Sequence, residues 1–355
     1  MRNLTILSLV LLLNGVCGSA QTEAQKKLIS ETLKFYPDHT QVAFALIENG
    51  KTGYYGVQRE NDSLIMVENS SSVFEIGSIT KVFTSTLLAD FVIDGKVKLD
   101  DPINGYIRIP LKDSIRFTFK QLANHTSGLP RMPADFAKTA MLTPDNPFKN
   151  YDNKKLEEYL STSLKLENEP GKVCQYSNLG AGLLGYVLCE ISGEDYQTLL
   201  KKMIFSKHGM TSSTTRRDEV GPRLVKGLDG KGKETSNWDL AALVGAGGIL
   251  STVEDLSRFA LAQFDTANKE LELTRVKTWF DSQGLDLGLG WHVVKSKIGA
   301  EWYWHNGGTG GYTTSMAIDM NRQNGIIILT NISAFNENSK KIDELCFALM
   351  KTLKQ

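Results

Sequence analysis

The sequence predicts an α+β fold: one antiparallel sheet built from both chain ends, flanked by terminal helices, with a mainly helical lobe inserted. Strand signals concentrate in residues 41–57 and 301–329, whereas helical periodicity fills the segment between them. Hairpins so far apart in the sequence must pair with each other or expose their edges, so a single sheet is the economical arrangement. We expect one domain over residues 21–355, with a sheet part at about 21–72 and 288–355 and a helical lobe at about 73–287.

The first two strands are expected to form a hairpin. Gln41–Glu48 is a short apolar run, and Asn49-Gly50 separates it from Gly53–Val57. Asn-Gly between two such runs is the strongest short-range hairpin signal, because both residues tolerate the positive φ that the tight turn requires.

Three further strands are expected near the C-terminal end. They are assigned to Glu301–His305, Tyr312–Asp319 and Ile326–Leu329, with a turn over residues 321–325 between the last two. Strands joined in this way form an antiparallel meander. A helix should follow from about Asn338 to Leu353, because its apolar residues recur on one face.

Apolar residues at helical spacing fill the middle of the chain. Two short patterns, at residues 156–160 and 183–188, mark helices there. A longer stripe begins directly after Ser78 and consists of Ile79, Phe83, Leu87 and Phe91. No repeat, low-complexity tract or linker divides the chain into independent domains.

The N-terminus has the form of a secretory signal peptide over residues 1–20. Arg2 supplies a positive charge, Leu4–Leu13 is an apolar run too short to span a bilayer, and small residues precede a cleavage site after Ala20. The mature protein is therefore expected in the periplasm or outside the cell. A lipid anchor on Cys17 is the alternative.

Composition excludes one broad class of function. The 40 basic and 40 acidic residues cancel, so no charge excess points to nucleic acid or to an anionic membrane. After the signal peptide, no segment reaches the roughly eighteen consecutive apolar residues that a membrane span needs. Cys174, Cys189 and Cys346 are each expected to be buried free thiols, with a Cys174–Cys189 disulfide as the alternative.

Ser78 and Lys81 form the first candidate catalytic pair. A serine hydroxyl is a poor nucleophile and needs a base within hydrogen-bond distance. Side chains at i and i+3 of a helix share a face, and the helix N-terminus favours negative charge that develops there. A desolvated lysine can lose its proton near neutral pH and act as that base. A capping serine beside an exposed lysine is the ordinary alternative.

Tyr176-Ser177-Asn178 is the second candidate segment, placed after the turn at Pro170-Gly171 and before a helical run. A tyrosine beside a lysine can shuttle a proton, and an asparagine amide can position Lys81 and a substrate carbonyl. The alternative is a tyrosine packed in the core and a serine or asparagine that caps the following helix.

His305-Asn306-Gly307-Gly308 is the third segment, at the end of an aromatic strand. Glycines let a substrate approach the strand backbone closely. The Gly308 N–H could then join the Ser78 N–H in an oxyanion hole, and His305 could offer partial positive charge to a substrate carboxylate. A glycine-rich hairpin with a structural histidine is the alternative.

In this order the three segments resemble the motifs of the serine β-lactamase and penicillin-binding superfamily, and more narrowly its branch of class C β-lactamases, D-alanyl-D-alanine peptidases and esterases. The resemblance extends to Phe74–Lys81, Leu122–Pro130 and Gly245–Thr252, and runs from about residue 40 to about residue 335. It implies a β-lactamase-like fold and an acyl-enzyme mechanism. Its catalytic residues would be Ser78, Lys81 and Tyr176, and its substrate-binding residues Asn178, His305, Asn306, Gly307 and Gly308.

One departure bears on the substrate. Class C β-lactamases usually carry Lys-Thr-Gly at the third motif, whereas this chain has His305-Asn306-Gly307. The departure argues against strong β-lactam hydrolysis but leaves the acyl-enzyme chemistry intact. We expect a hydrolase of β-lactams or D-alanyl peptides. The alternatives are a broad-range carboxylesterase and a penicillin-binding sensor whose acylated Ser78 is not hydrolysed.

No cofactor or metal is expected. The five histidines lack metal-ligand spacing, and Gly227–Lys233 is followed by Glu234 where a phosphate-binding loop needs Ser or Thr. The expected partner is therefore a small-molecule β-lactam, peptide or ester, bound by a monomer without nucleic acid or a stable membrane span.

Overall fold

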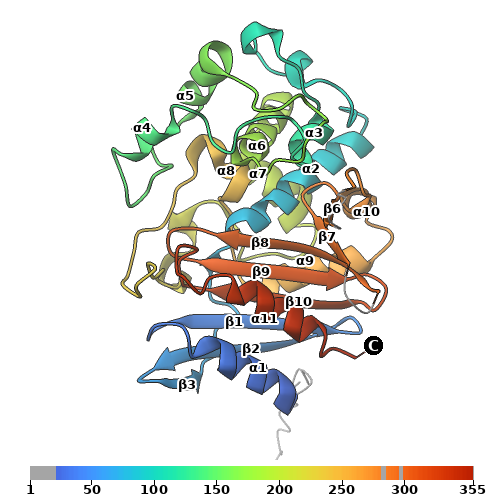
Figure 1. Ribbon diagram of the computed structural model, residues 1–355. Helices are drawn as coiled ribbons and strands as arrows, with labels where there is room; N and C mark the ends of the chain where they lie inside the picture. The colour runs from blue at the N-terminus through green and yellow to red at the C-terminus, as the bar shows by residue number, and fades with distance from the viewer. Residues whose placement is uncertain (1–20, 281–284, 296–298, 355) are drawn as a thin grey trace, which may run out of the picture.

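Both ends of the chain meet in one antiparallel sheet, as predicted. The computed structural model describes residues 21–280, 285–295 and 299–354, so the predicted signal peptide and Cys17 lie outside the described residues. The sheet has the order β3-β2-β1-β10-β9-β8-β7-β6. Strands β1 (Gln41–Glu48) and β10 (Asn324–Thr330) are antiparallel neighbours at its centre, with Phe44 opposite Ile328 (Figure 1).

The strand signals at both ends are confirmed: β1 has the predicted bounds, β9 begins one residue later than predicted, and the other three strands extend beyond their signals. Asn49 and Gly50, with φ of 50° and 71°, turn β1 into its hairpin partner. The remaining strands of the sheet are β2 (Lys51–Glu60), β3 (Ser63–Met66), β6 (Leu285–Leu287), β7 (His292–Lys295), β8 (Glu301–Gly308) and β9 (Thr313–Asp319). Strands β3, β6 and β7 were not predicted, because each is too short for its alternation to stand out.

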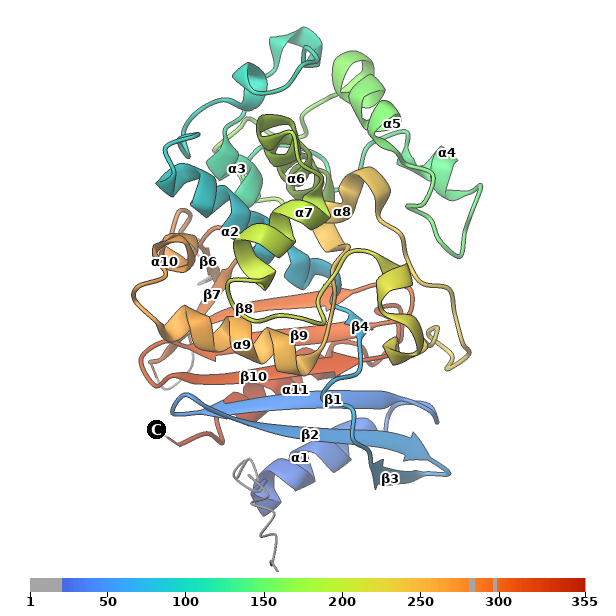
Figure 2. The same ribbon diagram turned by 180° about the vertical axis from the view of Figure 1, so that it is seen from behind.

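Helices cover both faces of the sheet. The terminal helices α1 (Glu23–Leu33) and α11 (Lys341–Met350) lie on one face, where Trp302 of β8 stacks on Phe347. Helix α9 (Val253–Phe264) lies across the other face, against β1 and β10 (Figure 2). The central strands are consequently buried on both sides, which explains why β9 and β10 have no exposed residue.

The helical lobe lies beyond β8 in Figure 1 and is centred on α2 (Thr80–Ile93) and α6 (Asn178–Ser192). Eleven of the fourteen residues of α2 are buried, because α6, α8 and α10 all contact it. The other elements of the lobe are α3 (Phe119–Ala123), α4 (Phe136–Ala140), α5 (Asn153–Glu158), α7 (Tyr196–Leu200), α8 (Val244–Gly247), α10 (Lys269–Arg275) and a two-strand ribbon of β4 (Phe74–Glu75) and β5 (Leu250–Ser251).

Several predicted details are corrected. The segment assigned to the lobe contributes α9 and β6 to the sheet part, because both pack on or pair with the sheet. Helix α11 is shorter at both ends than the predicted 338–353.

Cys189 is a half-buried free thiol, so no disulfide joins it to Cys174. Cys174 is exposed rather than buried, and Cys346 is buried as expected. Within the described ranges, no helix combines the length and apolarity that crossing a membrane requires.

Candidate active site

Ser78 lies where the sheet meets the helical lobe. A 3₁₀ turn, Gly77–Ile79, joins β4 to α2 and carries Ser78 at its centre. The predicted helix thus begins two residues after Ser78, but the tight turn continues into α2 and keeps the expected spacing. Ser78 is half-buried, and its Oγ lies 3.0 Å from Nζ of Lys81, so the predicted pair is formed.

Lys81 is held by polar partners although it is only 2% exposed. Its Nζ lies 2.9 Å from Oδ1 of Asn178 and 2.6 Å from the carbonyl oxygen of Ala246. Burial, and secondarily the charge of Arg131, lowers the pKa of Lys81 well below its usual value. Nζ also donates to Ser78 Oγ, so an amine that has lost one proton can keep its hydrogen bonds to the two carbonyl oxygens and turn its lone pair towards Ser78. Lys81 is thereby suited to accept the serine proton.

The Tyr176–Asn178 segment lies at the start of α6 and contacts the Ser78–Lys81 pair. Ser177 caps this helix by accepting from the Gly180 N–H at 2.8 Å, so the structural alternative holds for Ser177 alone. The Tyr176 ring lies 4.7 Å from Lys81 Nζ, and the phenol hydrogen-bonds Ser78. Burial raises the pKa of Tyr176 to about 12, although the bond with Ser78 and the charge of Arg131 oppose the rise. Tyr176 is therefore a protonated phenol that can donate.

The end of β8 packs directly against the turn that carries Ser78. Gly77 has a φ of +52°, and a Cβ there would lie 2.5 Å from the Gly308 nitrogen. A Cβ on Gly307 would lie 1.9 Å from the Ile76 carbonyl oxygen. Both positions need glycine because any side chain would force the strand and the turn apart. The contact places Gly308 against Gly77, the residue before Ser78, and the oxyanion hole of the Ser78 and Gly308 N–H groups stays a prediction.

His305 faces the site but does not carry the expected charge. It is 1% exposed, and burial, followed by the nearby His292 and Lys81, lowers the pKa of His305 well below its ordinary value. Its Nδ1 lies 2.6 Å from the Asn306 carbonyl oxygen. A neutral imidazole donates through that nitrogen, which leaves Nε2 as an acceptor. The lowered pKa therefore argues against the partial positive charge predicted for His305, and its role in substrate binding stays a prediction.

The side chain of Asn306 does not face Ser78. Successive side chains of a strand point to opposite faces of the sheet, so Asn306 points away from the site. Its Nδ2 donates to the Asp343 carboxylate of α11 at 2.7 Å, on the face that the terminal helices cover. The Asn306 side chain thus ties β8 to α11, and the substrate-binding role assigned to Asn306 stays a prediction that this contact does not favour.

Two further histidines were not predicted as part of the site. The His125 ring lies 4.6 Å from the Tyr176 ring and accepts from the Ser177 N–H through Nδ1 at 3.3 Å. The His292 ring lies 5.1 Å from the His305 ring. Burial lowers the pKa of His125 well below its usual value and that of His292 to about 4, so both are neutral. In the part of the chain that is described, no cluster of acidic, histidine or cysteine side chains could hold a metal ion.

Arg131 is the remaining residue that the sequence did not single out. It directly follows the matched segment Leu122–Pro130, and position within that loop is the only signal that could have indicated it. The guanidinium carbon lies 5.0 Å from the centre of the Tyr176 ring. Arg131 therefore adds a cation to a site in which burial lowers the pKa of the lysine and of the histidines.

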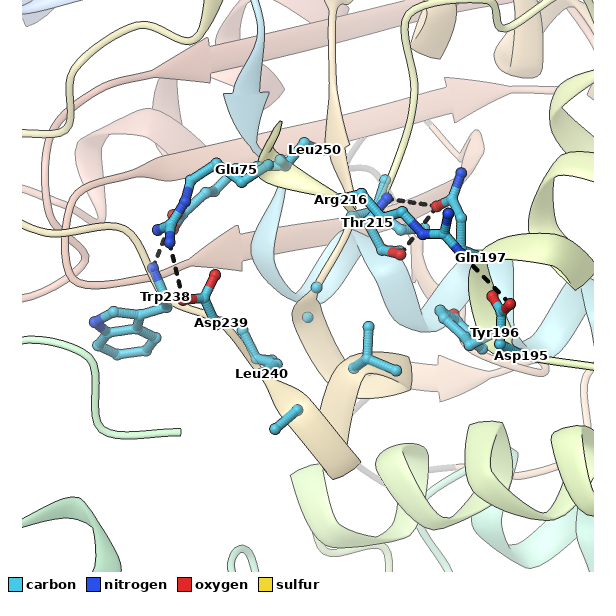
Figure 3. A pocket seen from close by; sticks show the side chains of 16 residues that line it. Glu75, Asp195, Tyr196, Gln197, Thr215, Arg216, Trp238, Asp239, Leu240 and Leu250 are labelled. Atoms are coloured by element: carbon cyan, nitrogen blue, oxygen red, sulfur yellow. Dashed lines mark hydrogen bonds and ion pairs between the residues drawn. The ribbon is translucent and has the colours of Figure 1, made fainter. Parts of the chain in front are cut away.

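A separate cavity of about 420 Å³ lies between β4, α7 and α8 (Figure 3). Arg216 and Arg217 line it and are paired with Asp195 and Asp239 at 3.4 and 3.0 Å. None of the predicted catalytic or binding residues lines this cavity. It borders the candidate site through Glu75, whose carboxylate accepts from the Trp238 N–H at 2.9 Å.

This chain is similar to several known proteins. The D-alanyl-D-alanine-carboxypeptidase/endopeptidase AmpH of Escherichia coli (strain K12) is 29% identical over 92% of this chain and 91% of its own length. A beta-lactamase of Pseudomonas fluorescens is 27% identical over 76% of this chain and 73% of its own length. The crystal structure of a beta-lactamase/D-alanine carboxypeptidase from Pseudomonas syringae has a TM-score of 0.77 at 21% identity, covering 94% of this chain and 99% of that chain, and supports the fold.

A family model decides the assignment. The model described as Beta-lactamase matches residues 33–347, which include all three motifs and both chain ends of the sheet. The resemblance expected from the sequence is confirmed: this chain belongs to the Beta-lactamase family of serine hydrolases, within the superfamily of serine β-lactamases and penicillin-binding proteins.

Proposed function

We propose that this protein hydrolyses D-alanyl peptides through a covalent acyl-enzyme on Ser78. The observation that carries the proposal is the placing of Ser78 Oγ 3.0 Å from Nζ of a buried lysine that also donates to Asn178 Oδ1 and to the Ala246 carbonyl oxygen. That arrangement is an activated serine nucleophile. The relative that spans most of both chains acts on D-alanyl-D-alanine peptides according to its name, which favours this substrate class.

In the acylation step, Ser78 Oγ attacks the scissile carbonyl carbon while its proton passes to Lys81 Nζ. The carbonyl oxygen becomes an oxyanion that the N–H groups of Ser78 and Gly308 stabilise. When the C–N bond breaks, the leaving amine takes a proton from the Tyr176 phenol, and the Lys81 ammonium returns a proton to the phenolate. Asn178 keeps Lys81 oriented throughout. The products are a free amino acid and an ester on Ser78.

Deacylation repeats these steps with water as the nucleophile. Water gives its proton to the base, attacks the Ser78 ester carbon and releases the peptide acid, which regenerates the serine hydroxyl. We also propose that the reaction takes place outside the cytoplasm, since residues 1–20 have the pattern of a signal peptide.

Hydrolysis of β-lactams is the second candidate, and the likeness to a beta-lactamase over 76% of this chain favours it. A β-lactam amide would acylate Ser78 through the same groups. The two functions differ in which acyl-enzyme is hydrolysed quickly. This site also differs from the usual third motif of β-lactamases, because a neutral His305 stands in place of a lysine.

One panel of substrates tests the proposal. The purified protein is incubated separately with an N-acylated D-alanyl-D-alanine peptide, a chromogenic cephalosporin and a short-chain nitrophenyl ester, and the mass of the protein is followed. We expect release of D-alanine that Ser78→Ala abolishes. Rapid cephalosporin turnover without peptide cleavage would support the second candidate instead. Ester turnover alone would identify an esterase, and a long-lived adduct without turnover a penicillin-binding sensor.

A further inference from the structure

Arg131 is held at the mouth of the site by its backbone. It lies in the segment between α3 and α4, and its carbonyl oxygen accepts from the N–H groups of Asn178 and Leu179 at 3.0 and 3.2 Å. The preceding carbonyl, that of Pro130, accepts from the Ser177 hydroxyl at 2.7 Å. The segment is thus tied to the start of α6, the same turn that delivers Tyr176 and Asn178 to Lys81.

The Arg131 side chain is exposed, and its guanidinium lies over the Tyr176 ring. Over residues 21–280, 285–295 and 299–354, no carboxylate lies within ion-pair distance of it. An exposed arginine gains little from stacking alone, and its planar fork of donors suits a carboxylate oxygen pair. The guanidinium therefore keeps unused donors beside the Tyr176 ring.

The neutral state of His305 makes this cation significant. A substrate with a carboxylate near the scissile bond needs a positive partner in the site. Nδ1 of His305 lies 2.6 Å from the Asn306 carbonyl oxygen and donates to it; in the neutral ring that burial favours, Nε2 is an acceptor, and an acceptor repels a carboxylate. Lys81 is occupied by Ser78, Asn178 and Ala246. Among the described residues placed at this site, Arg131 is the cation whose side chain is exposed.

We propose that Arg131 binds a carboxylate of the substrate and is the residue by which this site prefers anionic acyl donors over neutral ones. The inference rests on the proposed function for its substrate class but concerns a different property, namely the preference between two substrates that differ only in charge. The carboxylate can belong to the leaving group, as in a C-terminal D-alanine, or to the acyl side, and the test distinguishes the two.

The experiment compares matched substrate pairs by kcat/KM. One pair is an N-acylated D-alanyl-D-alanine peptide and its C-terminal amide, which places the charge on the leaving group. A second pair carries D-glutamate or D-glutamine on the acyl side. A third pair, a nitrophenyl ester with or without a carboxylate in its acyl chain, needs no amide hydrolysis. The variants are Arg131→Gln and Arg131→Lys, with Arg108→Gln as control.

Arg108 is a suitable control because it is an exposed arginine of the same lobe. It pairs with Glu190, twelve residues along α6 from Asn178 and therefore roughly 18 Å away. Its replacement should leave every charged-to-neutral ratio unchanged, so that loss of a surface charge alone is separated from loss of the charge at the site.

The expected result is that wild-type protein prefers the charged partner in at least one pair and that Arg131→Gln lowers this ratio by about 10- to 100-fold. Arg131→Lys should keep most of the ratio, because it keeps the charge. The pair that responds identifies the position of the carboxylate. If both partners of every pair lose rate equally in Arg131→Gln, Arg131 only supports Tyr176 and the inference is overturned, as it is if wild-type protein shows no preference.

Failure of the proposed function has a different signature. A wild-type protein that cleaves the ester pair but neither peptide pair would refute peptide hydrolysis, while the charged-to-neutral ratio for the esters would still decide the role of Arg131.

Discussion

Nζ of Lys81 lies 2.9 Å from Oδ1 of Asn178, a residue 97 positions away in the chain. This bond joins α2 to α6, and the Ala246 carbonyl adds α8 to the same nitrogen. Three elements of the helical lobe thus meet at one amine, which explains why Lys81 is buried in a single orientation towards Ser78.

Replacing Lys81 should abolish most activity without unfolding the protein. Lys81→Met removes the base, and Lys81→Arg supplies a cation that stays protonated, so both should lower kcat by about 10²- to 10⁴-fold. Steady-state kinetics and thermal melting measure the two properties. Lys269→Met is the matched control, since Lys269 is exposed and pairs with Glu272 on α10. Retention of wild-type kcat in Lys81→Arg would refute a neutral amine as the base.

The pH profile should report the lowered pKa of Lys81. The base works when it is neutral, so kcat/KM should rise with pH as Lys81 loses its proton. The midpoint of this rising limb should lie below the ordinary lysine pKa of 10.5. Burial is the main cause and the Arg131 charge the second. Removing that charge favours the ammonium, so the limb should move to higher pH in Arg131→Gln. An unmoved limb would mean that Arg131 does not act on the base.

Gly77→Ala should impair both stability and catalysis. Alanine is strained at a φ of +52°, and its Cβ would lie 2.5 Å from the Gly308 nitrogen and displace one oxyanion donor. We expect a fall of about 10- to 100-fold in kcat and a loss of roughly 1–3 kcal/mol in unfolding free energy. Gly95→Ala shares the positive φ, +70°, but has no atom within 4 Å of its Cβ, so it should lose stability and keep kcat. Equal kcat in the two variants would argue against the Gly308 donor.

Asn306→Ala tests whether the Asn306 side chain ties β8 to α11 and does not contact the substrate. Its amide donates to Asp343 across the face of the sheet that lies away from Ser78. Removing it should lower the unfolding free energy by roughly 1–3 kcal/mol, because Asp343 loses a partner in a buried setting, while kcat/KM stays within about twofold of wild type. Chemical denaturation and steady-state kinetics measure these. His305→Ala, which changes the face towards the site, should by contrast lower kcat/KM. A similar kinetic loss in both variants would return Asn306 to the site.

The sequence predicted the sheet because its central strands carry strong local signals. Asn49-Gly50 predicted the first hairpin. The apolar runs of β1 and β10 are too long to stay exposed, so they were expected to pair inside one sheet. Strands β6 and β7 escaped prediction because three or four residues hold too little alternation, and their place depends on pairing with β8. Helix α9 was assigned to the lobe because periodicity shows that a helix has an apolar face but not which surface covers it.

The site was predicted in part, for a comparable reason. Ser78 and Lys81 are neighbours on one turn, so spacing places them together, and the family order of motifs added Tyr176 and Asn178. The state of His305 depends on its burial beside His292, which no local pattern encodes. The role of Arg131 could not be predicted from the sequence, because its position over the Tyr176 ring depends on how the loop after α3 folds. Contacts between distant segments are thus the part that required the structure.

The central claim is that Ser78 is the acylated nucleophile, and intact-protein mass spectrometry with peptide mapping tests it most directly. Wild-type protein, Ser78→Ala and Lys81→Met are each incubated with a penicillin, quenched within seconds and digested. We expect one adduct in wild-type protein, located on the peptide that contains Ser78, a strongly slowed adduct in Lys81→Met and none in Ser78→Ala. An adduct that persists in Ser78→Ala, or that maps to another residue, would contradict the assignment.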